Sequence, residues 1–241
     1  MKKQSNQTVR MATPGQIKDV ISAVVESIPV NNLTYEMAQY FIGRKKWLGT
    51  EMKKIFSVDN SHADLIADWQ AFYCGLGIDC DLSGVIIPDD PGGFGRVIIM
   101  AQGITPQSGY DLCAKFFPCW KYTDKNLDEV VVSERTAKDV YAIRVRDRVE
   151  ADEELRNRSY NDLKRQGIIG ITLEEREIFE LKFFKETAGK HLDIKNWTFC
   201  LGSCYGDGNV PSASWRSGEF EVDWCNPGDV FDDLCSRQAV S

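Results

Sequence analysis

The chain has 241 residues, of which 43% are hydrophobic and 27% are charged, and its formal net charge at pH 7 is −7. With a mean hydropathy of −0.32, this composition is typical of a globular protein and excludes the disordered class. The acidic balance supplies no strong basic face, which a nucleic-acid-binding protein needs in order to displace counterions. No apolar run reaches the length of a bilayer span, so we expect neither a nucleic-acid partner nor a membrane span.

The first seven residues are basic, but no apolar stretch follows them. This pattern predicts no secretory signal, which makes a cytoplasmic location the default expectation and reduced thiols the expected state. The eight cysteines contain no C-x-x-C pair and are accompanied by only two histidines, so the spacing predicts no metal site. We expect most of these cysteines to be small core residues.

Residues 1–75 are predicted to form a helical N-terminal region. Thr13-Pro14 offers a cap and a proline at the first helical position, and apolar residues recur after it at helical spacing. A second helix is predicted from Thr34 or Tyr35 to Phe56, and a third over residues 63–73. After Gly75 the sequence pattern changes from helical spacing to β-rich runs separated by turn residues. Residues 76–241 are therefore predicted to form a second, α+β domain.

Two β-rich runs, 85–87 and 97–100, flank a stretch of Pro, Asp and Gly that is typical of a turn. The stretch lacks the G-K-[ST] ending of a phosphate-binding loop, so a hairpin is predicted. A short helix over 110–120 should follow.

The second half of the α+β domain begins with residues 141–145, whose alternating apolar and polar side chains predict a half-buried strand. A helix is predicted over 160–166. Thr172 and Glu175 have the spacing of a capping box, which opens a further helix ending near Gly189. Residues 197–201 are predicted to form a strand. The predicted fold class is therefore α+β, with helices at the N-terminus and short antiparallel strands toward the C-terminus.

The C-terminal segment, about residues 200–241, interleaves two classes of residue. One is a run of Ser, Cys, Tyr, Asn, Gly, Asp and Arg that fills loops beside a predicted strand over 220–224. Loops on a rigid scaffold are where binding surfaces are usually built. The other is a sparse framework that comprises Val210, Pro211, Trp215, Phe220, Val222, Trp224, Pro227, Leu234, Arg237 and Val240.

Lysine is missing from this segment: all sixteen lysines lie in residues 1–199. Asn template codons whose two adenines mutate would account for this pattern, because the fixed pyrimidine third base makes Lys, Gln, Glu, Met and Trp unreachable. Ser, Cys, Tyr, Asp, Gly, Arg, Val and Phe remain reachable, and these residues make up the fillers, with Glu219, Glu221 and Gln238 as the exceptions. Antibody paratopes favour a similar set, since Tyr, Ser, Gly and Asn make adaptable contacts at low entropic cost.

The spacing Gly202-Ser203-x-x-x-Asp207-Gly208-x-Val210-Pro211-x-x-x-Trp215, followed by Val222-Asp223-Trp224-x-x-Pro227 and Leu234-x-x-Arg237-x-x-Val240-Ser241, resembles the variable region of diversity-generating-retroelement target proteins. The upstream stretch Gly167-Ile168-Ile169-Gly170-Ile171-Thr172-Leu173 is similar to one found in such proteins of candidate-phyla bacteria. The similarity covers about residues 110–241.

This resemblance implies a C-type-lectin-like domain that binds variable macromolecular ligands, proteins first among them, without catalysis and without a cofactor or metal. It also implies that residues 237–241 lie beside 141–145. Its expected variable, ligand-binding positions are Cys204, Tyr205, Asn209, Ser212, Ser214, Arg216, Ser217, Gly218, Cys225, Asn226, Gly228, Asp229, Val230, Phe231, Cys235 and Ser236.

Two alternatives remain open at this point. The first is a relative of the formylglycine-generating oxidases, which share the fold and use a paired-cysteine copper site, for which Cys200/Cys204 or Cys225/Cys235 would be the candidates. The second is a structural adaptor in which the C-terminal segment is an ordinary loop-rich β end and the N-terminal helices dock onto a larger assembly.

Overall fold

A computed structural model describes residues 13–26, 33–48 and 62–241 and divides the chain into two units, 1–59 and 60–241. The division lies earlier than the boundary predicted after Gly75. Helix α4 (Ala63–Gly75) belongs to the larger unit, because its Trp69 and Tyr73 are buried in that unit's main core. The Tyr73 hydroxyl also donates a 2.7 Å hydrogen bond to the carbonyl of Ile99.

The smaller unit contains helices α1 (Pro14–Glu26) and α2 (Tyr35–Gly43). The hydroxyl of Thr34 caps α2 by accepting a 3.3 Å hydrogen bond from the amide of Met37. The predicted second helix was expected to continue to Phe56. Instead α2 ends at Gly43 and a further helical turn covers 45–48, while residues 49–56 of that prediction lie outside the described residues. No residue of α2 is buried.

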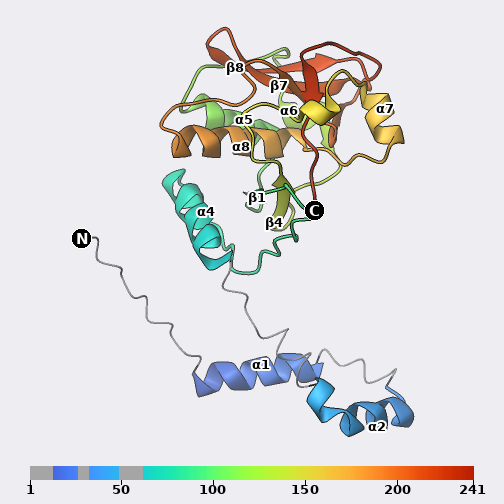
Figure 1. Ribbon diagram of the computed structural model, residues 1–241. Coiled ribbons are helices and arrows are strands. Elements are labelled where there is room, and N and C mark those ends of the chain that lie inside the picture. The colour runs from blue at the N-terminus through green and yellow to red at the C-terminus, as the bar shows by residue number, and fades with distance from the viewer. Residues whose placement is uncertain (1–12, 27–32, 49–61) are drawn as a thin grey trace, which may run out of the picture. The chain divides into compact units, whose positions relative to one another are not determined.

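The larger unit is a mixed α/β structure, so the α+β class predicted from the sequence is confirmed at this level (Figure 1). After α4 the elements are β1 (Arg96–Met100), α5 (Pro106–Ala114), β2 (Cys119–Lys121), α6 (Leu127–Val130), β3 (Val131–Ser133), β4 (Tyr141–Val145), a 3-10 turn (Glu153–Leu155), α7 (Tyr160–Arg165), α8 (Leu173–Glu186), β5 (Trp197–Phe199), β6 (Ser203–Tyr205), β7 (Val210–Arg216), β8 (Glu219–Cys225) and β9 (Leu234–Ser236). Among the helices described, none is long and apolar enough to cross a bilayer.

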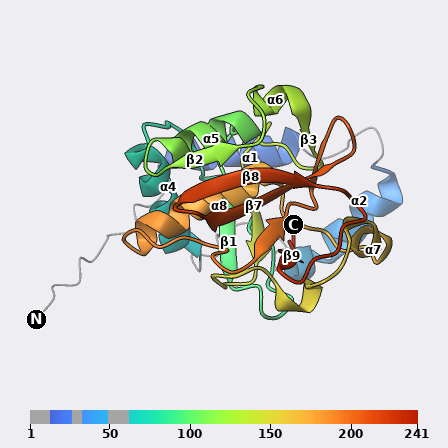
Figure 2. The same ribbon diagram turned by 90° about the horizontal axis from the view of Figure 1, so that it is seen from above.

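The largest sheet of this unit has five strands in the order β2-β8-β7-β5-β9, of which β5, β7, β8 and β9 come from the C-terminal part of the unit and β2 from an earlier part. β7 and β8 are an antiparallel hairpin, whereas β2 pairs with β8, and β9 with β5, in parallel. Helices α5 and α8 lie under one face of the sheet (Figure 1), and the view from above shows the hairpin crossing over α8 (Figure 2). Ala213, Phe220 and Val222 point into the main core on this helix-covered face.

The hairpin predicted between 85–87 and 97–100 is wrong. Residues 85–87 are not a strand, and β1 pairs with β4 in an antiparallel ladder in which Arg96 faces Val145. The predicted turn between the two runs is present, but it does not join two paired strands. Within it, the carboxylate of Asp90 accepts hydrogen bonds from the amides of Gly92 and Phe94. The helix predicted over 110–120 is shifted, because a capping box at Thr105 starts α5 at Pro106.

The end of the chain lies beside β4, as the resemblance implied. Arg144 and Val240 form an antiparallel bridge in which each amide donates to the other's carbonyl, at 2.8 and 2.9 Å. The last residues of the chain are thus attached to β4, in the two-stranded β1–β4 sheet.

Helix α8 starts at the predicted capping box. The Thr172 hydroxyl accepts from the amide of Glu175 at 3.3 Å, and the Glu175 carboxylate accepts from the amide of Thr172 at 2.7 Å. The helix is buried from Leu173 to Lys182. Buried charged groups are costly unless they are paired. Glu177 is the exception on this helix, because both of its carboxylate oxygens are buried without a hydrogen-bond partner.

Burial raises the pKa of Glu177 well above its usual range, and nearby carboxylates add to the effect. The folded state therefore holds this proton more tightly than the unfolded state. The stability that the proton confers is fully present below the unfolded pKa of about 4.3 and is lost as the pH rises through the folded pKa.

We predict that Glu177→Gln flattens the dependence of stability on pH. The wild-type free energy of unfolding should fall by up to about 1.4 kcal/mol per pH unit above pH 5 from this group alone, and the variant should not show that fall. Urea unfolding between pH 4.5 and pH 8 measures the difference, with exposed Glu129→Gln as the matched control. Parallel pH profiles for wild type and Glu177→Gln would contradict the prediction.

Candidate binding surface

The β7–β8 hairpin ends in a tight two-residue turn. Ser217 and Gly218 connect Arg216 to its partner Glu219, and both have positive φ angles, 55° and 89°. Two left-handed residues are what a type I′ hairpin turn requires, because its twist matches that of the flanking strands. The turn is exposed and projects from a rigid part of the sheet.

The sheet face opposite α5 and α8 carries a row of side chains that runs across four strands. The register places Trp120 of β2 beside Glu221 of β8, Glu221 beside Ser214 of β7, and Ser214 next to the position of Trp197 on β5. Successive side chains of a strand point to opposite faces, so these four share one face. Trp120 is 42% exposed, Trp197 and Glu221 are half-buried, and Ser214 is buried between its larger neighbours.

Arg216 folds back over this face. Its guanidinium carbon lies 4.9 Å from the centre of the Trp197 ring, a cation–π arrangement. A small cavity of about 80 Å³ beside this pair is also lined by Lys195 and Asp233. The hairpin turn and the end of the last long loop therefore meet around Trp197.

That last loop connects β8 to β9 and spans residues 226–233. It is held by hydrogen bonds from the amide of Asn226 to the Asp229 carboxylate, at 2.9 Å, and from the amide of Asn161 to the carbonyl of Pro227, at 3.0 Å. Its tip presents two adjacent apolar side chains to solvent, Val230 at 45% and Phe231 at 51% exposure. An aromatic side chain at this exposure is available for contact with a partner.

The sixteen predicted ligand-binding positions separate into three groups in the structure. Half-buried are Cys204, Asn209 and Asp229. Exposed are Arg216, Ser217, Gly218, Asn226, Gly228, Val230 and Phe231. We call these seven residues together with Trp197 the display surface. Buried, against expectation, are Tyr205, Ser212, Ser214, Cys225, Cys235 and Ser236.

Burial of these six residues follows from the position of their strands. β7 is the central strand of the sheet, and α7 packs on its outer face through a second core cluster that includes Leu163 and Cys225. The Cys225 thiol contacts the Ser212 hydroxyl at 3.8 Å, and the Ser236 hydroxyl donates to the carbonyl of Phe199 at 2.9 Å. Residues in such positions do not contact a ligand directly.

The predicted framework residues differ in how deeply they are buried. Phe220 and Val222 are fully buried. Trp215 is half-buried and stacks on His191 with ring centres 3.3 Å apart. Trp224 is 40% exposed and belongs to the surface rather than to the core.

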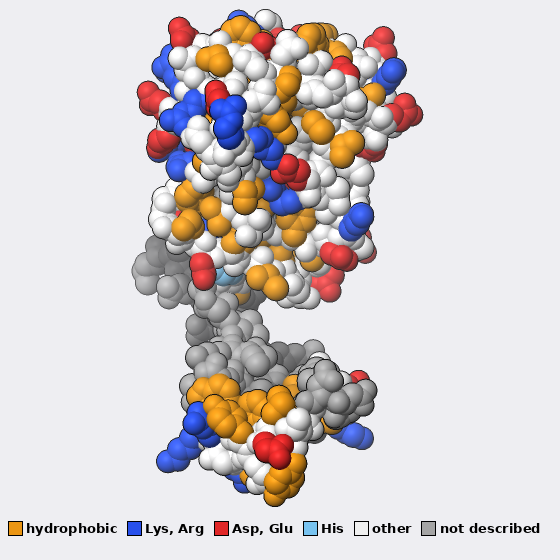
Figure 3. All heavy atoms as spheres, turned by 90° about the vertical axis from the view of Figure 1, so that its right-hand side faces the viewer, with side chains coloured by type: hydrophobic (Ala, Val, Ile, Leu, Met, Phe, Trp, Pro, Cys, Tyr) orange, Lys and Arg blue, Asp and Glu red, His pale blue; other side chains and the backbone are white. Residues whose placement is uncertain are grey.

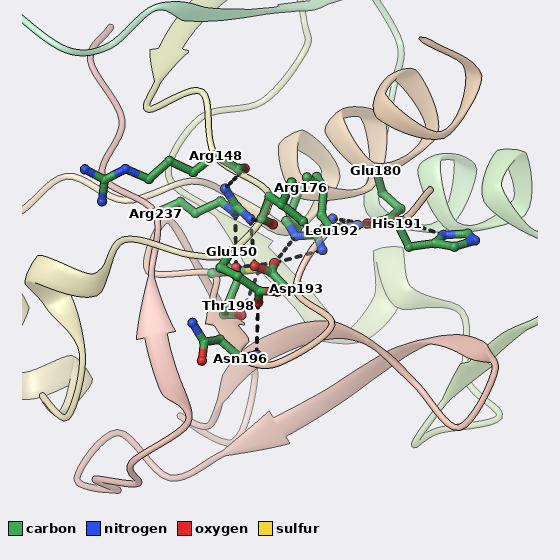
Figure 4. Close-up of polar contacts among 12 residues, drawn as sticks. Arg148, Glu150, Arg176, Glu180, His191, Leu192, Asp193, Asn196, Thr198 and Arg237 are labelled. Carbon is green, nitrogen blue, oxygen red and sulfur yellow. Dashed lines mark hydrogen bonds and ion pairs between the residues drawn. The ribbon is translucent and has the colours of Figure 1, made fainter. Parts of the chain in front are cut away.

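A buried ion network connects helix α8, strand β5 and the end of the chain (Figure 4). Figure 4 shows Arg237, Arg176 and Thr198 converging on Asp193. Arg237 Nη2 lies 2.6 Å from Asp193 Oδ1, and the Thr198 hydroxyl donates to Asp193 Oδ2 at 2.6 Å. Arg237 also donates to the carbonyls of Arg148 and Val149, at 3.0 and 2.7 Å.

The second half of this network lies on α8. Arg176 binds Asp193 Oδ2 through Nε at 2.9 Å and Glu180 Oε2 through Nη1 at 2.8 Å. Glu180 also contacts His191 Nδ1 at 2.8 Å. His191 lies between this carboxylate and the Trp215 ring.

The charges of the network balance, because two guanidiniums face two carboxylates and all four side chains are fully buried. Burial opposes the charge of Arg176, but Asp193 and Glu180 raise the pKa of its guanidinium above the ordinary range. Asp193 also lines the cavity of about 80 Å³ beside Trp197, and Arg148 and Val149 line a larger cavity of about 910 Å³. We interpret it as a structural cross-link between α8, β5, the 148–149 loop and the end of the chain.

Among the residues that the structure describes, no three His, Cys, Asp or Glu side chains are grouped as possible metal ligands. A thiol must lose its proton to bind a metal, and burial raises the pKa of Cys225 and of Cys235 to about 11. Burial also raises the pKa of Cys200 well above its usual value. All eight cysteines are free thiols.

Trp197 and Lys195 line the surface but were not predicted as site residues. The sequence did place Trp197 in a strand, but alternation alone does not reveal which face of a strand is covered. The other positions were predicted from the composition of residues 200–241, a segment that begins just after Lys195 and Trp197.

Comparison of the chain with protein-family models, curated proteins and solved structures gives no match.

We predict that Asp193→Asn lowers the free energy of unfolding by about 3–5 kcal/mol, because it leaves Arg176 and Arg237 buried with too little counter-charge. Asn tolerates the positive φ of 52° at this position, so the loss should report the charge and not backbone strain. Urea denaturation measures the change, with exposed Asp232→Asn in the same region as the control. A loss below about 1 kcal/mol would mean that the network contributes no more than an exposed ion pair.

Proposed function

We propose that the chain is a binding protein without catalytic activity, which recognises variable macromolecular ligands, proteins above all, through the display surface. The observation that carries the proposal is the separation of roles within residues 200–241. Framework residues such as Phe220 and Val222 are buried, whereas the Ser, Asn, Gly and Arg fillers of the 216–218 turn and the 226–231 loop are exposed.

The side chains on this surface suit the recognition of a protein. Arg and aromatic residues carry much of the contact energy at interfaces, and Arg216, Trp197 and Phe231 supply both kinds. Ser217 and Asn226 can donate and accept hydrogen bonds around them. The scaffold beneath is held by the Asp193 network, so little ordering of the backbone is required on binding.

We further propose that this surface is diversified by a retroelement acting on Asn template codons. The turn at 217–218 supports the idea on physical grounds, because its two left-handed positions favour Asn, Gly and Asp. These residues belong to the set reachable from an Asn codon. Adenine mutation could thus vary the turn without destroying the hairpin.

The C-type-lectin-like fold is part of the same proposal. Three features support it: the bridge between Val240 and Arg144, the helices α5 and α8 under the sheet, and the position of the predicted variable segment on the opposite side. The oxidase alternative is less favoured, since the Cys200 and Cys225 thiols are buried and their pKa values are raised.

We predict that alleles of the gene differ mainly at the exposed members of the display surface, and that a reverse-transcriptase gene with an adenine-differing template repeat lies nearby. Sequencing the locus from many individuals of the parent population tests both points. Buried Ser212 and Ser236 should vary less than exposed Ser217 and Asn226, because a large residue in the interior strains the core. Invariant residues 200–241, or a locus without a reverse transcriptase, would contradict the diversification mechanism.

A further inference from the structure

The negative charge of the chain is concentrated in the segment that carries most of the display surface. Residues 200–241 contain seven Asp and Glu residues, two Arg and no Lys, which together leave −5 of the chain's formal charge of −7. One of the two arginines, Arg237, is buried in the Asp193 network. Arg216 is therefore the exposed base that faces the seven acidic residues of this segment.

These seven carboxylates have no cationic partner of their own. On the side of the larger unit seen in Figure 3, acidic and basic side chains lie close together, and elsewhere in that unit Arg148 forms an ion pair with Glu154. Within the described part of the chain, none of the seven acidic residues of 200–241 forms an ion pair. Each of them is at least partly exposed, so their charge is available to a partner.

Three of the seven acidic residues lie along β8 on the sheet face opposite α5 and α8. Glu219, Glu221 and Asp223 occupy alternate positions of the strand, so their side chains point to one face at intervals of about 7 Å. We call these three residues the acidic row. Arg216 faces Glu219 in the register, but its guanidinium lies over the Trp197 ring. The row therefore keeps its negative charge.

Glu221, at the centre of the row, is affected by its charged neighbours. Burial raises the pKa of its carboxyl group, and the carboxylates of Glu219 and Asp223 raise it further, while Arg216 acts in the opposite direction. A cation bound over the row would relieve the repulsion among the three carboxylates.

The residues on either side of Glu221 suit contact with a basic side chain. Trp120 lies beside Glu221 and is 42% exposed, so an Arg or Lys that pairs with the carboxylate can also lie against the indole ring. On the other side, Ser214 is 4% exposed, and its hydroxyl forms no hydrogen bond with any described residue. A buried hydroxyl without a partner is unfavourable, and a water molecule enclosed beneath a bound ligand would satisfy it.

We propose that the acidic row selects ligands whose contacting surface carries Lys or Arg side chains, so that the display surface binds basic regions of partner proteins. This inference rests on the proposed function and names the class of ligand. None of the three row residues is among the sixteen predicted variable positions, so the preference for a basic partner would persist while the display surface varies. Complementary charge of this kind sets specificity and speeds association.

Fluorescence anisotropy with two labelled peptides tests the proposal on the full chain. One peptide alternates Lys with Ser, and the other alternates Glu with Ser. The Lys peptide should bind, more weakly at physiological salt than at low salt, and the Glu peptide should not bind. The triple variant Glu219→Gln, Glu221→Gln and Asp223→Asn should weaken binding of the Lys peptide about tenfold.

A second triple variant, Asp79→Asn, Asp89→Asn and Asp139→Asn, is the matched control. It removes the same net charge at three exposed residues outside the five-stranded sheet, and it should weaken binding less than about twofold. Equal losses in the two triple variants would assign binding to the overall charge of the chain and overturn the proposal. Equal binding of the Lys and Glu peptides would overturn it as well.

Panning of phage-displayed random heptapeptides on the full chain separates this inference from the proposed function. Enriched peptides should carry more Lys and Arg than the unselected library, and the acidic-row variant should lose them. Enriched peptides that lack this excess and no longer bind after Phe231→Ala would overturn the preference for basic ligands. That result would leave the display surface in place as the binding site.

Discussion

The contact of Asp193 with Arg176 and Arg237 is the interaction on which the C-terminal half of the structure depends. One carboxylate, fully buried, joins helix α8 to the end of the chain, and Thr198 adds the central sheet to the same point. Buried ion pairs contribute little net stability, but breaking one is expensive. The network therefore fixes how the sheet packs on α8. Because the loops are attached to the sheet, their positions are fixed as well.

This constraint explains why the candidate binding surface is smaller than the composition of residues 200–241 suggested. A segment that supplies strands to the middle of a sheet must bury about half of its side chains. Ser212 and Ser214 are buried on the central strand β7 and are not displayed. Freedom to vary is left to the hairpin turn and to the loop before β9, where Arg216 and Phe231 are exposed.

The proposed display surface offers side chains, with Arg216 stacked over Trp197 and the exposed Val230 and Phe231 on the loop before β9. The specificity of such a surface would depend on side chains that can be substituted without altering the strands beneath them.

The sequence by itself determined those elements whose signals are local. The Thr172 capping box, the alternation at Tyr141–Val145 and the helix near Tyr160 each depend on neighbours a few residues apart, and each is present where it was predicted. The tertiary structure decided what depends on distant partners. It paired β1 with β4 in place of residues 85–87, and it brought Asp193 together with Arg237. It also buried six of the sixteen positions predicted to bind a ligand, because composition records which residues are present whereas burial depends on what packs against them.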